Sequence, residues 1–186
     1  HQRKIARWLS RLWTSPVGRR GLLMAFRNSG KSTLVGLFCA WVLYRSPETR
    51  ILVMAADYAL AKKMVRNVKR IIERHPLTAG LKPEKAEQWA SDQFTVNRPV
   101  ELRDPSMLAK GLGANITGLR ADLIICDDVE VPKTCDTALK RAELRSRLDE
   151  LDYIVTPGGI QLYIGTPHSF YTCLLYTSDA ADDLIG

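Results

Sequence analysis

Hydrophobic residues along this chain recur in short runs that alternate with longer, helix-like stretches. The short runs are apolar throughout and end near Gly, Pro or Asp, which predicts strands buried on both faces of a parallel sheet. The longer stretches have the spacing of amphipathic or buried helices. We therefore expect an α/β fold with a mostly parallel sheet and helices on both faces. The expected strands are 21–24, 50–56, 93–96, 122–126 and 160–164, and the expected helices are 2–13, 34–44, 57–74 and 138–151.

Two stretches lack this regularity. Residues 77–92 are expected to be irregular or partly helical. Residues 99–118 are expected to be loop-rich, because two prolines and three glycines occur in them. No internal repeat or low-complexity segment breaks up the rest, so residues 21–172 form one expected domain, itself truncated.

The N-terminal segment 1–20 is expected to be a basic helix and a linker. Its helix has one apolar face, and basic residues occupy the remaining positions. Two interpretations are open: the apolar face packs against the domain, which we favour, or the helix contacts DNA. The apolar positions are Ile5, Trp8, Leu9 and Leu12.

The last residues, 173–186, match the in-frame translation of a transposon-end sequencing adapter, and we expect them not to be native. They contain three Asp and no Lys or Arg. Without them, 27 basic residues face 17 acidic ones, which raises the net charge from +7 to +10. Such an excess favours a polyanionic partner as much as a merely basic surface.

The cysteines and the apolar runs exclude several classes of protein. Cys39 and Cys126 fall in apolar runs and are expected in the core, and no C-x-x-C pair occurs before the tail, as is typical of a reducing cytoplasm. The histidines have no metal-ligand spacing with Cys135. The longest apolar run, 34–44, is too short to cross a bilayer, so no membrane partner is expected.

Residues 25–33, Ala-Phe-Arg-Asn-Ser-Gly-Lys-Ser-Thr, are typical of a phosphate-binding loop. A strand is expected before them and a helix after them, so backbone N–H groups would face the phosphates of ATP. Lys31 is placed to reach the β- and γ-phosphates, and the Ser32 hydroxyl to ligate Mg²⁺. The pattern departs from the usual one at Ala25, where Gly is normal, and Arg27 adds a second cation. The remaining expected nucleotide contacts are Asn28, Ser29, Gly30 and Thr33.

A pair of acids follows the expected strand 122–126, as in a Walker B segment. A carboxylate at that position can hold Mg²⁺ through water, and we assign this role to Asp127. A second carboxylate must orient and deprotonate the attacking water. Asp128 and Glu130 both qualify, and the sequence leaves the choice open.

A third motif, Gly165-Thr166-Pro167, closes the expected strand 160–164. The hydroxyl of Thr166 could sense the γ-phosphate and couple hydrolysis to motion. An ordinary turn at the end of a strand would have the same sequence. The motif therefore supports the other two and would be weak alone.

Three stretches together, 25–32, 116–132 and 164–167, resemble the ATPase domain of the large terminase subunit of tailed phages. The likeness extends from about residue 21 to residue 171 and is strongest to podovirus-type DNA maturases. Members of that family often have Ala at the first position of the loop and Arg two residues later. Ala25 and Arg27 therefore support the resemblance.

The resemblance implies a P-loop NTPase fold (RecA/ASCE-like) that hydrolyses ATP with Mg²⁺ to package double-stranded DNA into the prohead. It also implies non-specific contacts to the DNA backbone, the portal or prohead and the small terminase subunit as partners, a homo-oligomeric ring, and a location in the host cytoplasm. The nuclease domain of the family lies C-terminal to this stretch, so no nuclease residues are assigned.

The resemblance leaves two assignments open. Many members have Asp-Glu where this chain has Asp127-Asp128, so the catalytic carboxylate stays between Asp128 and Glu130. An arginine finger is expected at a subunit interface, with Arg120 and Arg103 as candidates, although each is more readily an ordinary surface arginine. Two alternative functions remain: a helicase-like, nucleic-acid-dependent P-loop ATPase, or a non-enzymatic nucleotide-binding adaptor for DNA or the capsid.

Overall fold

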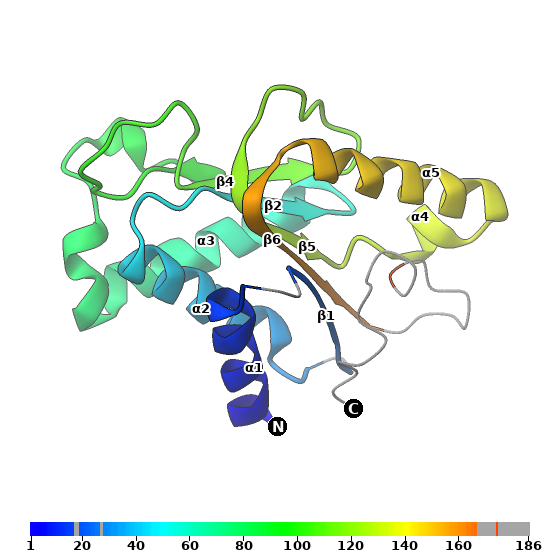
Figure 1. Ribbon diagram of the computed structural model, residues 1–186, viewed down its shortest axis with the longest axis horizontal. Helices are drawn as coiled ribbons and strands as arrows, with labels where there is room; N and C mark the ends of the chain where they lie inside the picture. The colour runs from blue at the N-terminus through cyan, green and yellow to red at the C-terminus, as the bar shows by residue number, and fades with distance from the viewer. Residues whose placement is uncertain (17–18, 27, 167–173, 175–186) are drawn as a thin grey trace.

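Six strands form a single sheet in the order β1-β6-β5-β2-β4-β3 in the computed structural model (Figure 1), which describes residues 1–16, 19–26, 28–166 and 174. Neighbouring strands are parallel, except that β3 runs antiparallel to β4. The expected α/β fold with a mostly parallel sheet is therefore confirmed. The strands are β1 (Arg20–Met24), β2 (Ile51–Ala55), β3 (Gln93–Phe94), β4 (Met107–Gly111), β5 (Ala121–Asp127) and β6 (Val155–Gly165).

Helices cover both faces of the sheet because alternate strand residues point to opposite faces. In β2, Val53 packs in a cluster with α1, α2 and α3, whereas Leu52 and Met54 pack in a second cluster with α5. Figure 1 shows α5 on the other side of the sheet from α1 and α2. The helices are α1 (Gln2–Thr14), α2 (Lys31–Arg45), α3 (Tyr58–Arg74), α4 (Pro132–Cys135) and α5 (Ala138–Asp149), with 3₁₀ turns at Pro76–Leu81, Ala86–Gln88 and Glu150–Tyr153.

The packed interpretation of α1 is confirmed. Its four apolar positions are buried, and they join the cluster formed by α2, α3 and the sheet. The helix lies so close to β1 that a Cβ atom on Gly21 would stand 2.8 Å from Leu12 Cδ2 and 2.9 Å from Trp8 Cη2. Gly21 therefore permits the close approach of α1 to the strand before the phosphate loop.

The helix α3 begins where the sequence predicted. Asp57 caps it, because its Oδ1 accepts a hydrogen bond of 2.9 Å from the Leu60 N–H. A capping carboxylate satisfies one of the free N–H groups of the first turn and offsets its partial positive charge.

The prediction that 99–118 is loop-rich was wrong in one respect, because β4 lies within it. The residues of β4 include Ala109 and Gly111 and have little intrinsic preference for a strand. Pairing with β2 along its whole length stabilises the strand instead. A Cβ atom on Gly111 would lie 2.9 Å from the Tyr58 nitrogen, so the glycine is needed for close packing rather than for a turn.

Several boundaries also differ from the expected ones; β6, for example, begins at Val155 rather than at residue 160. The expected strand 93–96 is only two residues long, because the Thr95 N–H donates to the Gln88 carbonyl and the Val96 N–H to Ser106 Oγ instead of to a neighbouring strand. The expected helix 138–151 ends at Asp149 and continues as a 3₁₀ turn. The short helix α4 was not predicted.

Replacing Trp8 by alanine is expected to lower the free energy of unfolding by about 3–5 kcal/mol, because it leaves a cavity between α1 and β1. Urea denaturation would measure the change. The matched control is Arg7→Ala on the exposed face of α1, which should change stability by less than about 0.5 kcal/mol. Equal, small effects of both variants would show that α1 is not docked.

Candidate nucleotide-binding site

The three predicted motifs meet at one edge of the sheet because β1, β6 and β5 are neighbours and parallel. Hydrogen bonds connect the segments beyond these strands. The Ala25 N–H donates to the Gly165 carbonyl at 3.2 Å, and the Asp128 N–H donates to the Ile164 carbonyl at 2.9 Å. Open parallel sheets bind their ligands at this carboxyl edge.

The loop between β1 and α2 has the backbone that a phosphate cradle requires. Asn28 and Gly30 have φ values of 64° and 82°, in the left-handed region that Gly enters freely and Asn tolerates. Gly30 precedes the first turn of α2, where free N–H groups and the helix dipole favour an anion. Ser29 is buried beside it, and Ala25 is half-buried. Arg27 lies outside the described residues.

Lys31 connects the loop to the end of β6. Its side chain is buried, and its Nζ donates a hydrogen bond of 3.0 Å to Thr166 Oγ1. An ammonium group in such a place needs compensation, and the negative charge of Asp127 acts on it from the end of β5. The structure thus brings Lys31, Thr166 and Asp127 together, as the sequence predicted from three separate motifs.

The paired acids at the end of β5 form an unusual electrostatic environment. The pKa of Asp127 is raised to about 6: burial contributes most to the rise, the charge of Asp128 adds to it, and Lys31 and Ser32 oppose it. Within the described part of the chain, one carboxylate oxygen of each acid, Oδ1 of Asp127 and Oδ1 of Asp128, is buried without a hydrogen-bond partner. Buried oxygens in this state are suited to a cation or to water.

The donor set of this edge fits Mg²⁺. The ion takes oxygen ligands and keeps several waters, with one or two carboxylates and the substrate phosphates completing its shell. The Ser32 hydroxyl and the Asp127 carboxylate line the same cavity and supply such oxygens. Among the described residues, no cluster of three or more His, Cys, Asp or Glu could bind a metal by itself.

A cavity of about 300 Å³ opens beside the paired acids. Ser32, Thr33, Asp127 and Asp128 form one side, and four residues of α3 form the other. Glu130 does not line this cavity; it is buried two residues further along, and it has interactions there. The residues from α3 are Leu60, Lys63, Met64 and Asn67.

The polar residues Lys63 and Asn67 were not predicted as site residues. The sequence indicated only that a basic helix follows the second strand. The first turns of this helix, α3, lie beside the phosphate loop because α3 packs on α2, and the sequence did not predict that packing. A Cβ atom on Gly36 would lie 2.4 Å from Asn67 Nδ2, so the glycine in α2 permits this close approach. Gly36 is therefore the feature of the sequence that could have indicated the close packing of α2 and α3.

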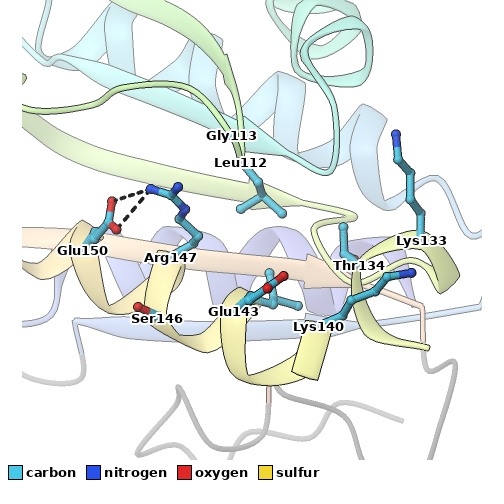
Figure 2. Close-up of a pocket in the computed structure, with 10 residues that line it drawn as sticks. Leu112, Gly113, Lys133, Thr134, Lys140, Glu143, Ser146, Arg147 and Glu150 are labelled. Carbon is cyan, nitrogen blue, oxygen red and sulfur yellow. Dashed lines mark hydrogen bonds and ion pairs between the residues drawn. The ribbon is translucent and has the colours of Figure 1, made fainter. Parts of the chain in front are cut away.

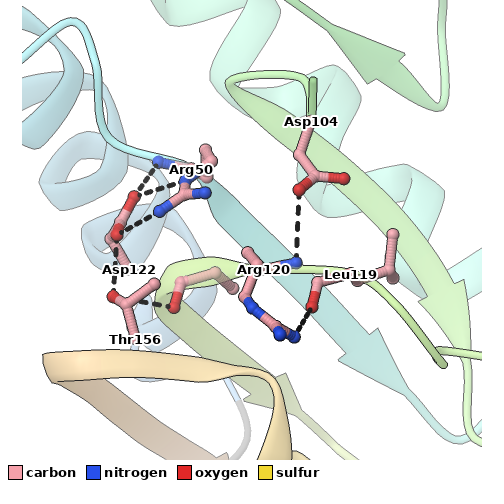
Figure 3. Close-up of polar contacts among 7 residues, drawn as sticks. Arg50, Asp104, Leu119, Arg120, Asp122 and Thr156 are labelled. Carbon is pink, nitrogen blue, oxygen red and sulfur yellow. Dashed lines mark hydrogen bonds and ion pairs between the residues drawn. The ribbon is translucent and has the colours of Figure 1, made fainter. Parts of the chain in front are cut away.

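The two candidate arginine fingers lie away from the phosphate loop of their own chain. Arg120 precedes β5, whereas Asp127 ends it, which separates them by roughly 23 Å at the usual rise of a strand. Figure 3 shows the Arg120 N–H donating to Asp104 and its guanidinium donating to the Leu119 carbonyl. Arg103 is exposed in the loop before β4. Either could act only on a neighbouring copy.

Arg120 lies at the amino edge of the sheet, where the strands β2 and β5 begin. This edge also contains a structural ion pair (Figure 3). Two guanidinium nitrogens of Arg50 each donate to Asp122 at 2.9 Å, and Thr156 Oγ1 donates to Asp122 at 2.8 Å. Burial would raise the pKa of Asp122, but these hydrogen bonds hold it below its usual value. They connect the starts of β2, β5 and β6, opposite the nucleotide edge.

A larger cavity, about 720 Å³, is not at the phosphate loop. It lies over α5 and α4 on the other face of the sheet, and charges of both signs line it (Figure 2). Some of these charges neutralise each other, because Arg147 pairs with Glu150 at 3.2 Å. The cavity thus lacks the converging groups that mark the edge described above.

Cys39 and Cys126 are buried as expected, and burial raises the pKa of Cys39 to about 12, so this thiol stays protonated. No helix within the described ranges is both long and apolar enough to cross a membrane.

Comparisons with known proteins identify a relative. No family model matches the chain. The chain is 32% identical over 156 residues to the terminase large subunit of Enterobacteria phage T3, an alignment that covers 83% of this chain and 27% of the relative. The chain thus spans about a quarter of the length of this curated relative, and the likeness predicted from the three motifs is confirmed.

Two solved structures are similar to this one. A chain of the S. cerevisiae complex of Dbp5 with Nup159, Gle1, IP6 and ADP matches with a TM-score of 0.55 and 12% identity, over 93% of this chain and 44% of that one. The large terminase ATPase domain of Thermus phage P74-26 matches with a TM-score of 0.44 and 20% identity, over 86% of this chain and 63% of that one. The first match supports the fold alone.

The raised pKa of Asp127 predicts that its ionisation costs stability. An acid with a raised pKa in the folded state binds protons more tightly there than when unfolded, so stability falls as the pH rises from about 4 to above 6. Relative to Asp127→Asn, the wild type should lose roughly 1–3 kcal/mol of unfolding free energy between pH 4 and pH 7.5 in urea titrations without Mg²⁺. Asp122→Asn is the control: the lowered pKa of Asp122 predicts the opposite sign. A pH-independent effect of Asp127→Asn would contradict the geometry.

Proposed function

We propose that this chain is part of a protein of the terminase large-subunit family and that it binds and hydrolyses ATP to drive the packaging of double-stranded DNA into a viral prohead. The observation that carries the proposal is the meeting of Lys31, Thr166 and the acid pair at one sheet edge, with buried acid oxygens left free to bind. The relative from phage T3, a terminase large subunit, supports the choice of family.

The loop 25–33 would bind the phosphates of ATP through its backbone N–H groups and the start of α2. Lys31 would reach the β- and γ-phosphates, and Ser32 with Asp127 would hold Mg²⁺. The ion supplies positive charge that neutralises the phosphoryl group during transfer. These roles for Ser32 and Asp127 agree with their place on the wall of one cavity.

Asp128 is our choice for the carboxylate that orients the attacking water. It lines the cavity beside Ser32, whereas Glu130 does not. Asp128 also has a φ of 46°, a left-handed conformation that turns the chain sharply after β5. Strained backbone of this kind is often retained at functional sites.

Thr166 would report the state of the nucleotide to the sheet. Lys31 donates to Thr166 in this structure, and a γ-phosphate would compete for the same ammonium group. Binding and release of phosphate would therefore change the contact between the loop and the end of β6. Such a local exchange can bias a larger movement when two arrangements differ little in free energy.

The partners and location follow from the family and are proposals. They are duplex DNA held by its backbone, the portal or prohead, the small terminase subunit, and further copies of this chain in a ring in the host cytoplasm. In a ring, Arg103 or Arg120 could reach the nucleotide of a neighbouring copy, although neither reaches its own. The similarity to a chain of the Dbp5 complex supports the fold alone, so it does not favour a helicase-like function.

Lys31→Ala is expected to abolish MgATP binding and phosphate release, because no other described side chain donates to Thr166 from the loop. Calorimetric titration and a phosphate-release assay would measure both. The control is Lys140→Ala on α5, which lies on the other face of the sheet and pairs with Asp136. Turnover that survives in Lys31→Ala would exclude the proposed site.

Asp128→Asn is expected to retain MgATP binding but to reduce turnover by about 10²–10⁴-fold, the usual worth of a general base. Glu130→Gln should retain most of the turnover if its folded state is intact by circular dichroism. The reverse result, with Glu130→Gln inactive and Asp128→Asn active, would assign the role to Glu130.

A further inference from the structure

The exposed face of α3 carries a row of four cations. Lys63, Arg66, Arg70 and Arg74 are spaced by three or four residues, opposite the face that packs on the sheet. All four are exposed, and we call them the basic stripe. Its length is roughly 16 Å at the rise of an α-helix.

The stripe is not neutralised within the chain. None of these four side chains forms an ion pair with any residue that the structure describes. Like charges three or four residues apart destabilise a helix, by about 0.2–0.5 kcal/mol per pair. A surface that is merely solvated would mix signs, so an uncompensated row of this length indicates an anionic partner.

The neighbouring charges of α3 are used differently. Lys69 donates to the Trp89 carbonyl at 2.8 Å, and Glu73 accepts from Trp89 Nε1 at 2.7 Å. Lys62 lies over the Tyr58 ring. Lys69 and Glu73 thus hold α3 against the segment before β3, whereas the contact of Lys62 lies within α3 itself. The stripe is the part of the helix left to face outward.

The stripe begins at the candidate nucleotide site. Lys63 lines the cavity that Ser32, Asp127 and Asp128 also line. From there the other three cations lead away along α3. A polyanion bound on the stripe would therefore lie on the helix whose first turns border the acids.

We propose that the basic stripe binds the phosphate backbone of duplex DNA, an inference that rests on the proposed function. Binders of single strands stack bases on aromatic side chains within a basic groove. The stretch of α3 that carries the stripe, 59–74, contains no aromatic residue. Backbone contacts by Lys and Arg are independent of sequence, as a packaging motor requires.

The other face of the sheet provides a matched control. Lys133, Lys140 and Arg147 lie over the large cavity (Figure 2), and two of them pair with acids of their own chain, Asp136 and Glu150. Replacing these three by Gln removes the same formal charge as replacing three residues of the stripe. A general effect of net charge would therefore be equal in the two variants.

The test compares the wild-type chain, Arg66→Gln/Arg70→Gln/Arg74→Gln, and Lys133→Gln/Lys140→Gln/Arg147→Gln. Lys63 is kept because it borders the acids, and the basic residues of α1 are unchanged in all three proteins. Fluorescence anisotropy with a 30-base-pair duplex of arbitrary sequence would give the affinity from 50 to 300 mM NaCl. Each lost phosphate contact lowers the slope of log K against log salt by about 0.9, so the stripe variant should lose about 2.7.

We expect the slope of log K against log salt to fall by about 2.7 in the stripe variant and by less than about 1 in the control. Equal losses in both variants, an unchanged slope in the stripe variant, or no duplex binding by the wild type would overturn the inference. So would intact duplex binding with loss of self-association in sedimentation, because the stripe would then be a contact between copies. MgATP turnover of the wild-type chain, measured in parallel without DNA, tests the proposed function separately.

Discussion

The position of β6 between β1 and β5 is the constraint on which the rest of the structure depends. Because the three strands are parallel neighbours, their carboxyl ends place a lysine, a threonine and two aspartates within one small region. Burial of Asp127 and the neighbouring charge of Asp128 raise the pKa of Asp127, and Lys31 opposes the rise only in part. The groups at this edge can bind a phosphate and a cation, but their burial lowers the stability of the fold, as is common at functional sites.

The rest of the fold supports that edge. Bonds from Arg50 and Thr156 to Asp122 fix the opposite ends of β2, β5 and β6, so the strands cannot slide relative to one another. Gly21 and Gly36 allow α1 and α3 to approach β1 and α2 closely. The position of α3 brings Lys63 to the acids and turns a row of cations outward. A nucleotide site and an anion-binding surface thus share one helix.

Much of this arrangement could be predicted from the sequence, because its main signals are local. Lys31, Asp127 and Thr166 each follow an apolar run that ends at a turn, and such runs indicate parallel strands without knowledge of the fold. The residues that were missed depend on tertiary contacts. The strand β4 is stabilised by pairing with β2, and Asn67 and Lys63 reach the cavity only through helix packing. The choice between Asp128 and Glu130 likewise depends on which of the two residues lines that cavity, and only the structure shows this.

The most direct test is a crystal structure of the chain with Mn²⁺ in place of Mg²⁺ and a non-hydrolysable ATP analogue. Anomalous scattering locates the ion without reference to the protein. The account predicts one peak between Ser32 and Asp127, with the triphosphate along the loop 25–33 and the γ-phosphate beside Lys31. A peak and a triphosphate elsewhere, such as the cavity over α5, would contradict the central claim.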